Sequence, residues 1–105
     1  MDKREIIIDK VKDYKSLIHG KLPLQFDKFY LFGSYAKGTP REHSDIDIAL
    51  VVNHISDDDY WASIYSLWKL TEKIDTRIEP HLIARDTDYA GFLDEIQKTG
   101  VEIID

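Results

Sequence analysis

Cysteine is absent from this chain of 105 residues, which excludes a disulfide framework, a thiolate zinc site and a cysteine nucleophile. Long apolar runs are also absent, and no window approaches the roughly 18 apolar residues that a membrane span needs. The three prolines and five glycines are scattered between periodic segments, so the chain has no linker and no low-complexity tract. We therefore expect one domain over residues 1–105, in the cytoplasm and without a membrane partner.

Positive charge is in short supply as well. Fourteen basic side chains stand against twenty acidic ones, which gives a formal net charge of −6. Because a negative field repels phosphates, we expect no direct DNA binding. A ligand that carries phosphate must be held locally by backbone amides, a helix N-terminus or bound cations.

Apolar residues make up 43% of the chain, enough for a hydrophobic core. They recur with helical spacing in some segments and alternate or cluster in others, which predicts helices and strands in turn along the chain. This alternation is typical of the α/β (α+β) fold class. The predicted helices cover residues 7–18, 56–74 (with Ser56 as the cap) and 87–99, and the predicted strands cover residues 27–32, 45–52, 77–84 and 101–104.

Some apolar residues of the predicted helices carry expectations of their own. In the last helix, Ala90, Leu93 and Ile96 share one face and should point inward. Trp61 and Trp68 lie one heptad apart in the preceding helix. Aromatic side chains at helical spacing are more often core or interface anchors than a platform for stacking bases, so we expect one of these two structural roles.

Acidic residues on two of the predicted strands form the candidate catalytic site. Asp45 and Asp47 are separated by one residue, so they project from the same face of a strand and can share a cation. Glu79 can join them if its strand lies beside theirs, although Pro80 argues for an edge strand or a bulge there. Three anions about 6 Å apart repel by roughly 3 kcal/mol per pair at an effective dielectric of about 20, which a cation would relieve.

Carboxylates that leave coordination positions open to water suit Mg²⁺ or Mn²⁺, and two such ions are the usual clamp for nucleotidyl transfer. An Asp-x-Asp pair alone also fits the solvent face of a half-exposed strand. Gly33 and Ser34 favour the functional interpretation, because a glycine-serine turn after a strand lets backbone amides and a hydroxyl approach a phosphate.

Gly33-Ser34, ten intervening residues and Asp45-Ile-Asp47 closely resemble the signature of the DNA-polymerase-β-like nucleotidyltransferase superfamily. The short chain is similar to the minimal nucleotidyltransferases that act as antitoxins of HEPN-domain toxins. The resemblance implies a small mixed β-sheet with helices packed on it, ATP bound through Gly33 and Ser34, and metal held by Asp45 and Asp47. Glu79 is the expected third acid, in a position where the superfamily more commonly has aspartate.

The resemblance also implies a function, with two alternatives left open. We expect a metal-dependent protein adenylyltransferase that moves AMP from ATP to a cognate HEPN toxin, assembles with it and thereby silences it. One alternative is a catalytically inactive antitoxin that masks its partner by binding. The other is transfer of a nucleotide to a small molecule such as an aminoglycoside.

Several cationic residues lie near the candidate site in the sequence. Lys37, Arg41 and His43 occupy the segment where a triphosphate could pass, although ordinary surface charges are an equally good interpretation. His81 shares a strand face with Glu79. A histidine beside an acid is more often its hydrogen-bonded partner than a general base, and we expect that role.

Overall fold

The structure, a computed structural model, describes residues 2–40 and 44–104. Within these ranges, no helix combines the length and the apolar character that crossing a membrane requires. The elements in chain order are α1 (Lys3–Ile18), β1 (Lys28–Phe32), α2 (Ser34–Lys37), β2 (Ile46–Val52), α3 (Asp57–Thr71), β3 (Ile78–Ala84), the 3₁₀ helix η1 (Arg85–Thr87), α4 (Phe92–Thr99) and β4 (Val101–Glu102).

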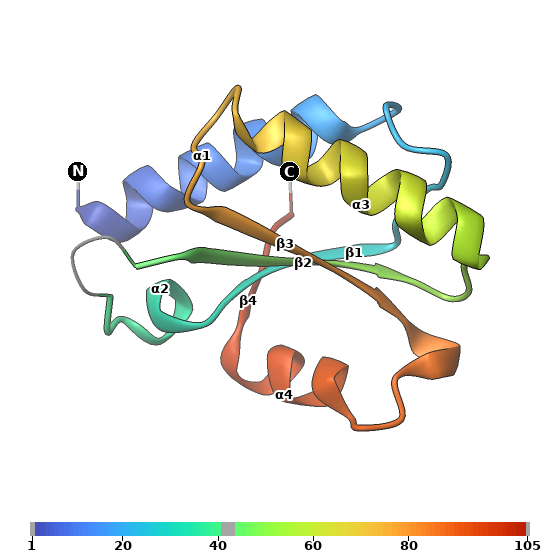
Figure 1. The fold of residues 1–105 in the computed structure, drawn as a ribbon. Coiled ribbons are helices and arrows are strands. Elements are labelled where there is room, and N and C mark those ends of the chain that lie inside the picture. Colours follow the sequence, from blue (N-terminus) through green and yellow to red (C-terminus); the bar gives the residue numbers. More distant parts are fainter. Residues whose placement is uncertain (1, 41–43, 105) are drawn as a thin grey trace.

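The strands form one mixed sheet with the order β3-β2-β1-β4 (Figure 1). β1 is antiparallel to both of its neighbours, β2 and β4. β2 and β3 are parallel, and α3 is the crossover that connects them. Parallel strands need such a long connection because a tight hairpin can join only antiparallel strands. The expected mixed α/β fold is therefore confirmed.

The sheet separates two apolar layers. Helices α1 and α3 cover one face and α4 covers part of the other (Figure 1). In β2 the alternation sends Ile46, Ile48 and Leu50 into the larger core, while Ala49 and Val51 join the smaller core under α4. All five side chains are fully buried, so β2 is the central strand that fixes the position of its neighbours.

Helix α3 begins as its sequence predicts. The Ser56 hydroxyl accepts a hydrogen bond from the backbone N–H of Asp59, which satisfies one of the free donors of the first turn. Asp57, Asp58 and Asp59 are exposed in that turn, where carboxylates stabilise the positive end of the helix dipole. This acidic run is therefore explained by the helix terminus.

The last helix differs from its prediction. Helical structure was expected over residues 87–99, but α4 begins only at Phe92. The Asp88 carboxylate accepts hydrogen bonds from the backbone N–H groups of Phe92 and Leu93, and Gly91 has a left-handed φ of 73°. These features start the helix five residues late. Leu93 and Ile96 are buried as expected, whereas the expectation for Ala90 is wrong, because it precedes the helix and is exposed.

The strand that carries Glu79 lies at the edge of the sheet. β3 has a neighbour on one side only, among the described strands. Pro80 pairs with Ile48 in an unbroken parallel register, so the edge alternative is confirmed and no bulge interrupts the ladder. An edge position tolerates proline because half of its backbone donors have no strand to bond.

A polar network fixes the entry to β3. Asp75 accepts hydrogen bonds from the Arg77 guanidinium and from Lys10 of α1, at 2.7 and 2.8 Å. Arg77 also donates to the Tyr35 hydroxyl of α2 at 3.1 Å. The bonds from Arg77, supported by Lys10, hold the pKa of the Asp75 carboxyl well below its ordinary value of 3.8. The network thus connects α1, α2 and the start of β3 through one carboxylate.

Replacing Asp75 with asparagine tests this network. A depressed pKa in the folded state contributes stability above the ordinary pKa, and this contribution is lost as the pH falls through the folded value. At pH 7 we expect Asp75→Asn to lower the free energy of unfolding by about 1 to 3 kcal/mol, the range for hydrogen bonds to a charged group. The difference from the wild type should shrink as the pH falls below 3.8. Urea denaturation across this pH range measures it.

The matched control is Asp13→Asn, which neutralises an exposed carboxylate on α1. We expect this surface change to alter stability by less than about 0.5 kcal/mol. Equal effects of the two variants at every pH would contradict the assigned role of Asp75.

Candidate active site

The site begins where β1 turns into α2. Gly33 occupies this turn with φ 75° and ψ −152°, a conformation that is essentially restricted to glycine. A Cβ atom at this position would overlap Oδ2 of Asp47. Glycine is therefore required for two reasons, its backbone angles and the closeness of the Asp47 carboxylate. Ser34 follows as the first residue of α2 and is partly buried.

β2 carries the first two acids to this turn. Asp47 pairs with Phe32 of β1 on one side and with Glu79 of β3 on the other. Its side chain is half-buried, while Asp45, just before the strand begins, is exposed. Because Ile46 is buried in the core beneath them, both aspartates are turned to the opposite face. The expected alternation of this segment is observed.

β3 brings the third acid beside the first two. Burial raises the pKa of the Glu79 carboxyl, as do hydrogen bonding with the Asp45 carboxyl and repulsion by Asp47, while His81 acts in the opposite direction. A raised pKa means that the folded protein disfavours a third negative charge at this point. The structure therefore brings the carboxyls of Asp45, Asp47 and Glu79 together.

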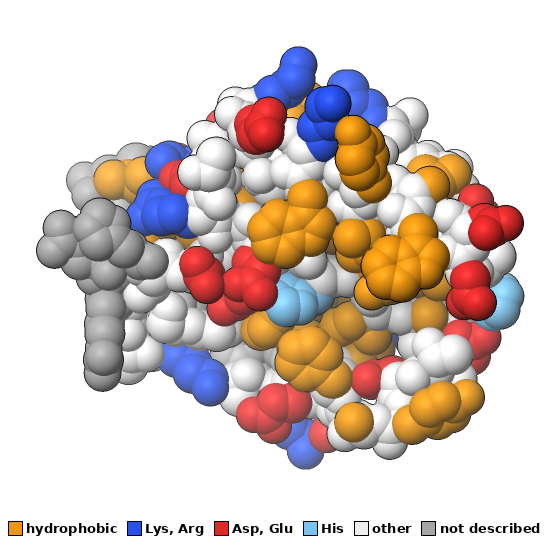
Figure 2. All heavy atoms as spheres, viewed as in Figure 1, with side chains coloured by type: hydrophobic (Ala, Val, Ile, Leu, Met, Phe, Trp, Pro, Cys, Tyr) orange, Lys and Arg blue, Asp and Glu red, His pale blue; other side chains and the backbone are white. Residues whose placement is uncertain are grey.

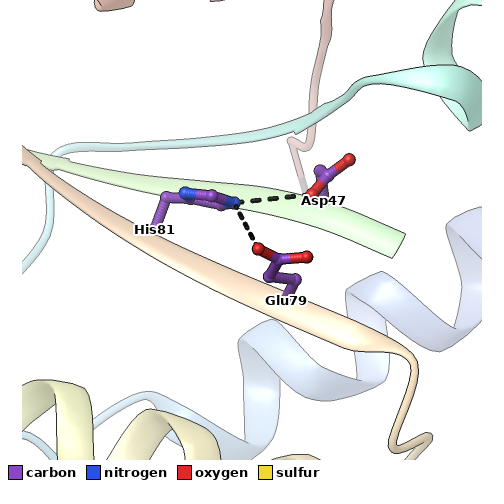
Figure 3. A group of neighbouring side chains, drawn as sticks. All are labelled: Asp47, Glu79 and His81. Carbon is purple, nitrogen blue, oxygen red and sulfur yellow. Dashed lines mark hydrogen bonds and ion pairs between the residues drawn. The ribbon is translucent and has the colours of Figure 1, made fainter. Parts of the chain in front are cut away.

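A fourth side chain completes the cluster. His81 Nε2 lies 3.4 Å from Asp47 Oδ1 and 3.9 Å from Glu79 Oε1 (Figure 3). The expectation that His81 is the hydrogen-bonded partner of an acid is confirmed, with Asp47 as the hydrogen-bonded acid. The sequence signal was the shared strand face of Glu79 and His81, but only the parallel register brings Asp47 within reach.

The cationic residues expected near a triphosphate are described only in part. Lys37 is exposed at the end of α2, the short helix that follows the Gly33 turn. Arg41 and His43 lie outside the described residues. The structure thus leaves the expectation for these two residues untested.

The donor set fits a divalent cation. Asp47, Glu79 and His81 offer ligand atoms that all lie within 4.8 Å of one another, and Asp45 adjoins them through Glu79. Carboxylate oxygens with room for water are the ligands that Mg²⁺ and Mn²⁺ prefer. Burial raises the pKa of the Glu79 carboxyl, and the Asp45 and Asp47 carboxyls raise it further. A cation bound here would offset both effects, because it stabilises the ionised carboxylate.

A glycine pair tests the close approach at the turn. Gly33 and Gly38 have φ values of 75° and 74°, but Gly38 lies in the left-handed helical region and a Cβ there would meet nothing within 4 Å. We expect Gly38→Ala to cost roughly 1 kcal/mol of stability. Gly33→Ala should cost more, because its backbone conformation is less accessible to alanine and the Asp47 carboxylate must move. Urea denaturation compares the two, and equal losses would argue against this close approach.

The sequence of this chain is also similar to known proteins. The family model described as "Polymerase beta, Nucleotidyltransferase" matches residues 14–105. A candidate protein adenylyltransferase of Methanocaldococcus jannaschii is 34% identical over 100 residues, which cover 92% of this chain and 98% of that protein.

Solved structures share the fold. A candidate nucleotidyltransferase of Sulfolobus solfataricus has a TM-score of 0.67 at 21% identity, over 94% of this chain and 80% of that one. A chain from a toxin–antitoxin structure with AMP-PNP has a TM-score of 0.66 at 22% identity, over 92% of this chain and 72% of that one. A chain from an MntA–HpeT toxin–antitoxin mutant has a TM-score of 0.61 at 24% identity, over 89% and 70%. Given the family match over residues 14–105 and the geometry of the acidic cluster, this chain belongs to the polymerase beta nucleotidyltransferase family.

Proposed function

We propose that residues 1–105 form a single minimal nucleotidyltransferase domain that transfers AMP from ATP to a protein acceptor, a cognate HEPN toxin that it neutralises. The observation that carries the proposal is the meeting of the Asp45, Asp47 and Glu79 carboxyls beside Gly33. The M. jannaschii relative, named as a candidate protein adenylyltransferase, supports a protein acceptor. The toxin–antitoxin chains that share the fold, one of them in a structure with AMP-PNP, support a toxin partner and an adenine nucleotide.

The proposed reaction is an in-line displacement at the α-phosphorus of ATP. A nucleophilic hydroxyl oxygen of the acceptor forms a bond to this phosphorus, and the bond from phosphorus to the oxygen that bridges to the β-phosphate breaks. Pyrophosphate leaves, the hydroxyl proton passes to a base or to water, and AMP stays on the acceptor. When bound, divalent cations, two Mg²⁺ ions or Mn²⁺ in their place, stabilise the charge on the phosphate oxygens.

Each site residue has a role in this proposal. Asp45, Asp47 and Glu79 hold the cations, which fits their mutual repulsion in the absence of positive charge. Gly33 leaves the turn beside Asp47 open, because any side chain there would occupy the space of the carboxylate. Ser34 offers a hydroxyl donor to the phosphates at the start of α2. We expect the reaction in the cytoplasm, because ATP is its donor.

A transfer assay tests the proposal. The protein is incubated with ATP labelled at the α-phosphate and Mg²⁺, with and without the partner protein encoded beside it. We expect label on the partner. An Asp45→Asn/Asp47→Asn double variant should lose at least about 100-fold in rate, the effect of removing a group that stabilises the transition state.

The matched control is Asp9→Asn/Asp13→Asn, which removes the same charge from exposed positions of α1 and should retain the wild-type rate. Two results would overturn the proposal. If the Asp45→Asn/Asp47→Asn variant protects cells from the toxin as well as the wild type does, the protein acts by masking. If label appears only on a small hydroxyl compound, the acceptor is not a protein.

An exposed aromatic row on α3 also supports a protein partner. Trp61 and Tyr65 are each 68% exposed and Trp68 is 46% exposed, at helical spacing on one face. Figure 2 shows apolar side chains gathered over α3, with acidic and histidine side chains beside them. Of the two expected roles for Trp61 and Trp68, the core is ruled out by their exposure. Large exposed aromatics are typical of protein interfaces, so we assign the row to the hetero-oligomer with the toxin.

Substitution of the row tests this assignment. We expect Trp61→Ala and Trp68→Ala each to weaken binding of the purified partner by about 30-fold, which corresponds to the roughly 2 kcal/mol of an interface hot spot. Isothermal titration calorimetry measures the affinity. Tyr89→Ala is the control, because Tyr89 is 90% exposed but lies outside α3. An unchanged affinity in both tryptophan variants would remove the row from the interface.

A further inference from the structure

The position of His81 in the acidic cluster suggests a role in metal selection. It stands two residues after Glu79 on β3, so the two side chains share a strand face. In the parallel register Glu79 is opposite Asp47 and His81 is opposite Ala49, which has no side chain long enough to separate them. The imidazole therefore reaches across to both acids from one side of the cluster (Figure 3).

Aromatic contacts hold the imidazole in this orientation. The ring of Phe32 meets that of His81 edge-on, with centroids 5.1 Å apart, and the ring of Phe92 lies 6.1 Å away. The two phenylalanine rings also pack on each other at 5.6 Å. The histidine side chain is 30% exposed, and its Nε2 atom faces the carboxylates.

The distances around Nε2 suit a shared cation. Nε2 is 3.4 Å from Asp47 Oδ1 and 3.9 Å from Glu79 Oε1. One ligand atom from each of the three residues lies within 4.8 Å of the other two. Adjacent ligands of an octahedral ion with bonds of about 2.1 Å are separated by about 3 Å, and opposite ligands by about 4 Å. Small side-chain adjustments would therefore place one ion in contact with all three atoms.

We propose that His81 Nε2 is a nitrogen ligand of the cation held by Asp47 and Glu79, so that this position selects a first-row transition ion such as Mn²⁺ over Mg²⁺. The inference rests on the proposed function, which requires a cation at these carboxylates. Imidazole binds transition ions well, whereas Mg²⁺ retains oxygen ligands and water. As a ligand, Nε2 would offer its lone pair to the cation in place of its hydrogen bond with Asp47, and Nδ1 would carry the ring proton.

Pulsed electron paramagnetic resonance of bound Mn²⁺ tests the nitrogen ligand directly. The full chain is loaded with Mn²⁺ alone, and electron spin-echo modulation is recorded for the wild type, His81→Gln and His54→Gln. We expect nitrogen modulation in the wild type and in His54→Gln, and its loss in His81→Gln. His54 is a suitable control because it is an exposed histidine that is also paired with an acid, Asp86. If His81→Gln does not fold, heavy-isotope labelling of histidine nitrogen in the wild type changes the modulation without any substitution.

Affinities supply a second readout. In His81→Gln the dissociation constant for Mn²⁺ should rise relative to that for Mg²⁺, so the ratio of the Mg²⁺ constant to the Mn²⁺ constant should fall by at least about 10-fold. Even partners outside the coordination sphere change metal affinity by this amount. Bound Mn²⁺ without nitrogen modulation would overturn the inference and leave the proposed function intact. Absence of Mn²⁺ binding, or binding that Asp47→Asn does not weaken, would overturn both.

Discussion

Repulsion between carboxylates is the constraint on which the site depends. Asp47 and Glu79 are opposite each other on parallel strands, and Asp45 adjoins Glu79. Nothing in their own charges favours this arrangement, so the apolar face beneath them must enforce it. Ile46 and Ile78 are fully buried directly beside these acids and pair with each other in the same register. The core that fixes the two strands therefore also holds these negative charges close together. A cation bound among them is strongly stabilised by their Coulomb attraction.

Much of the fold follows from short-range patterns, because those patterns have local causes. α1, β1, β2, α3 and β3 appear where periodicity predicts them, and Ser56 caps α3 through its own hydroxyl. Asp45 and Asp47 were predictable as a pair, because side chains two residues apart on a strand project from the same face. The late start of α4 was not predictable, because it depends on how Asp88 and Gly91 compete with an otherwise helical pattern.

Long-range register explains what the sequence could not supply. Glu79 joins the aspartates because β3 lies beside β2 in a register that places it opposite Asp47, and the spacing within either strand does not reveal this register. The same register brings His81 close to Asp47, so a residue expected only as the hydrogen-bonded partner of an acid becomes a member of the cluster. The Asp75–Arg77–Tyr35 network likewise connects segments whose contact depends on the completed fold. Periodicity also cannot distinguish the buried face of α3 from its exposed aromatic row, because both have helical spacing.

The edge position of β3 affects how another protein chain can approach the site. An exposed edge strand invites pairing with another chain, but Pro80 removes one backbone donor from this edge. The addition of a further strand is thereby weakened beside Glu79. The exposed aromatic side chains of α3 are the docking surface that we propose, and a partner there would bind through side-chain packing rather than through the strand ladder. A partner bound to α3 would therefore not need to extend the sheet beside the acidic cluster, and this mode of binding suits the transfer reaction that we propose.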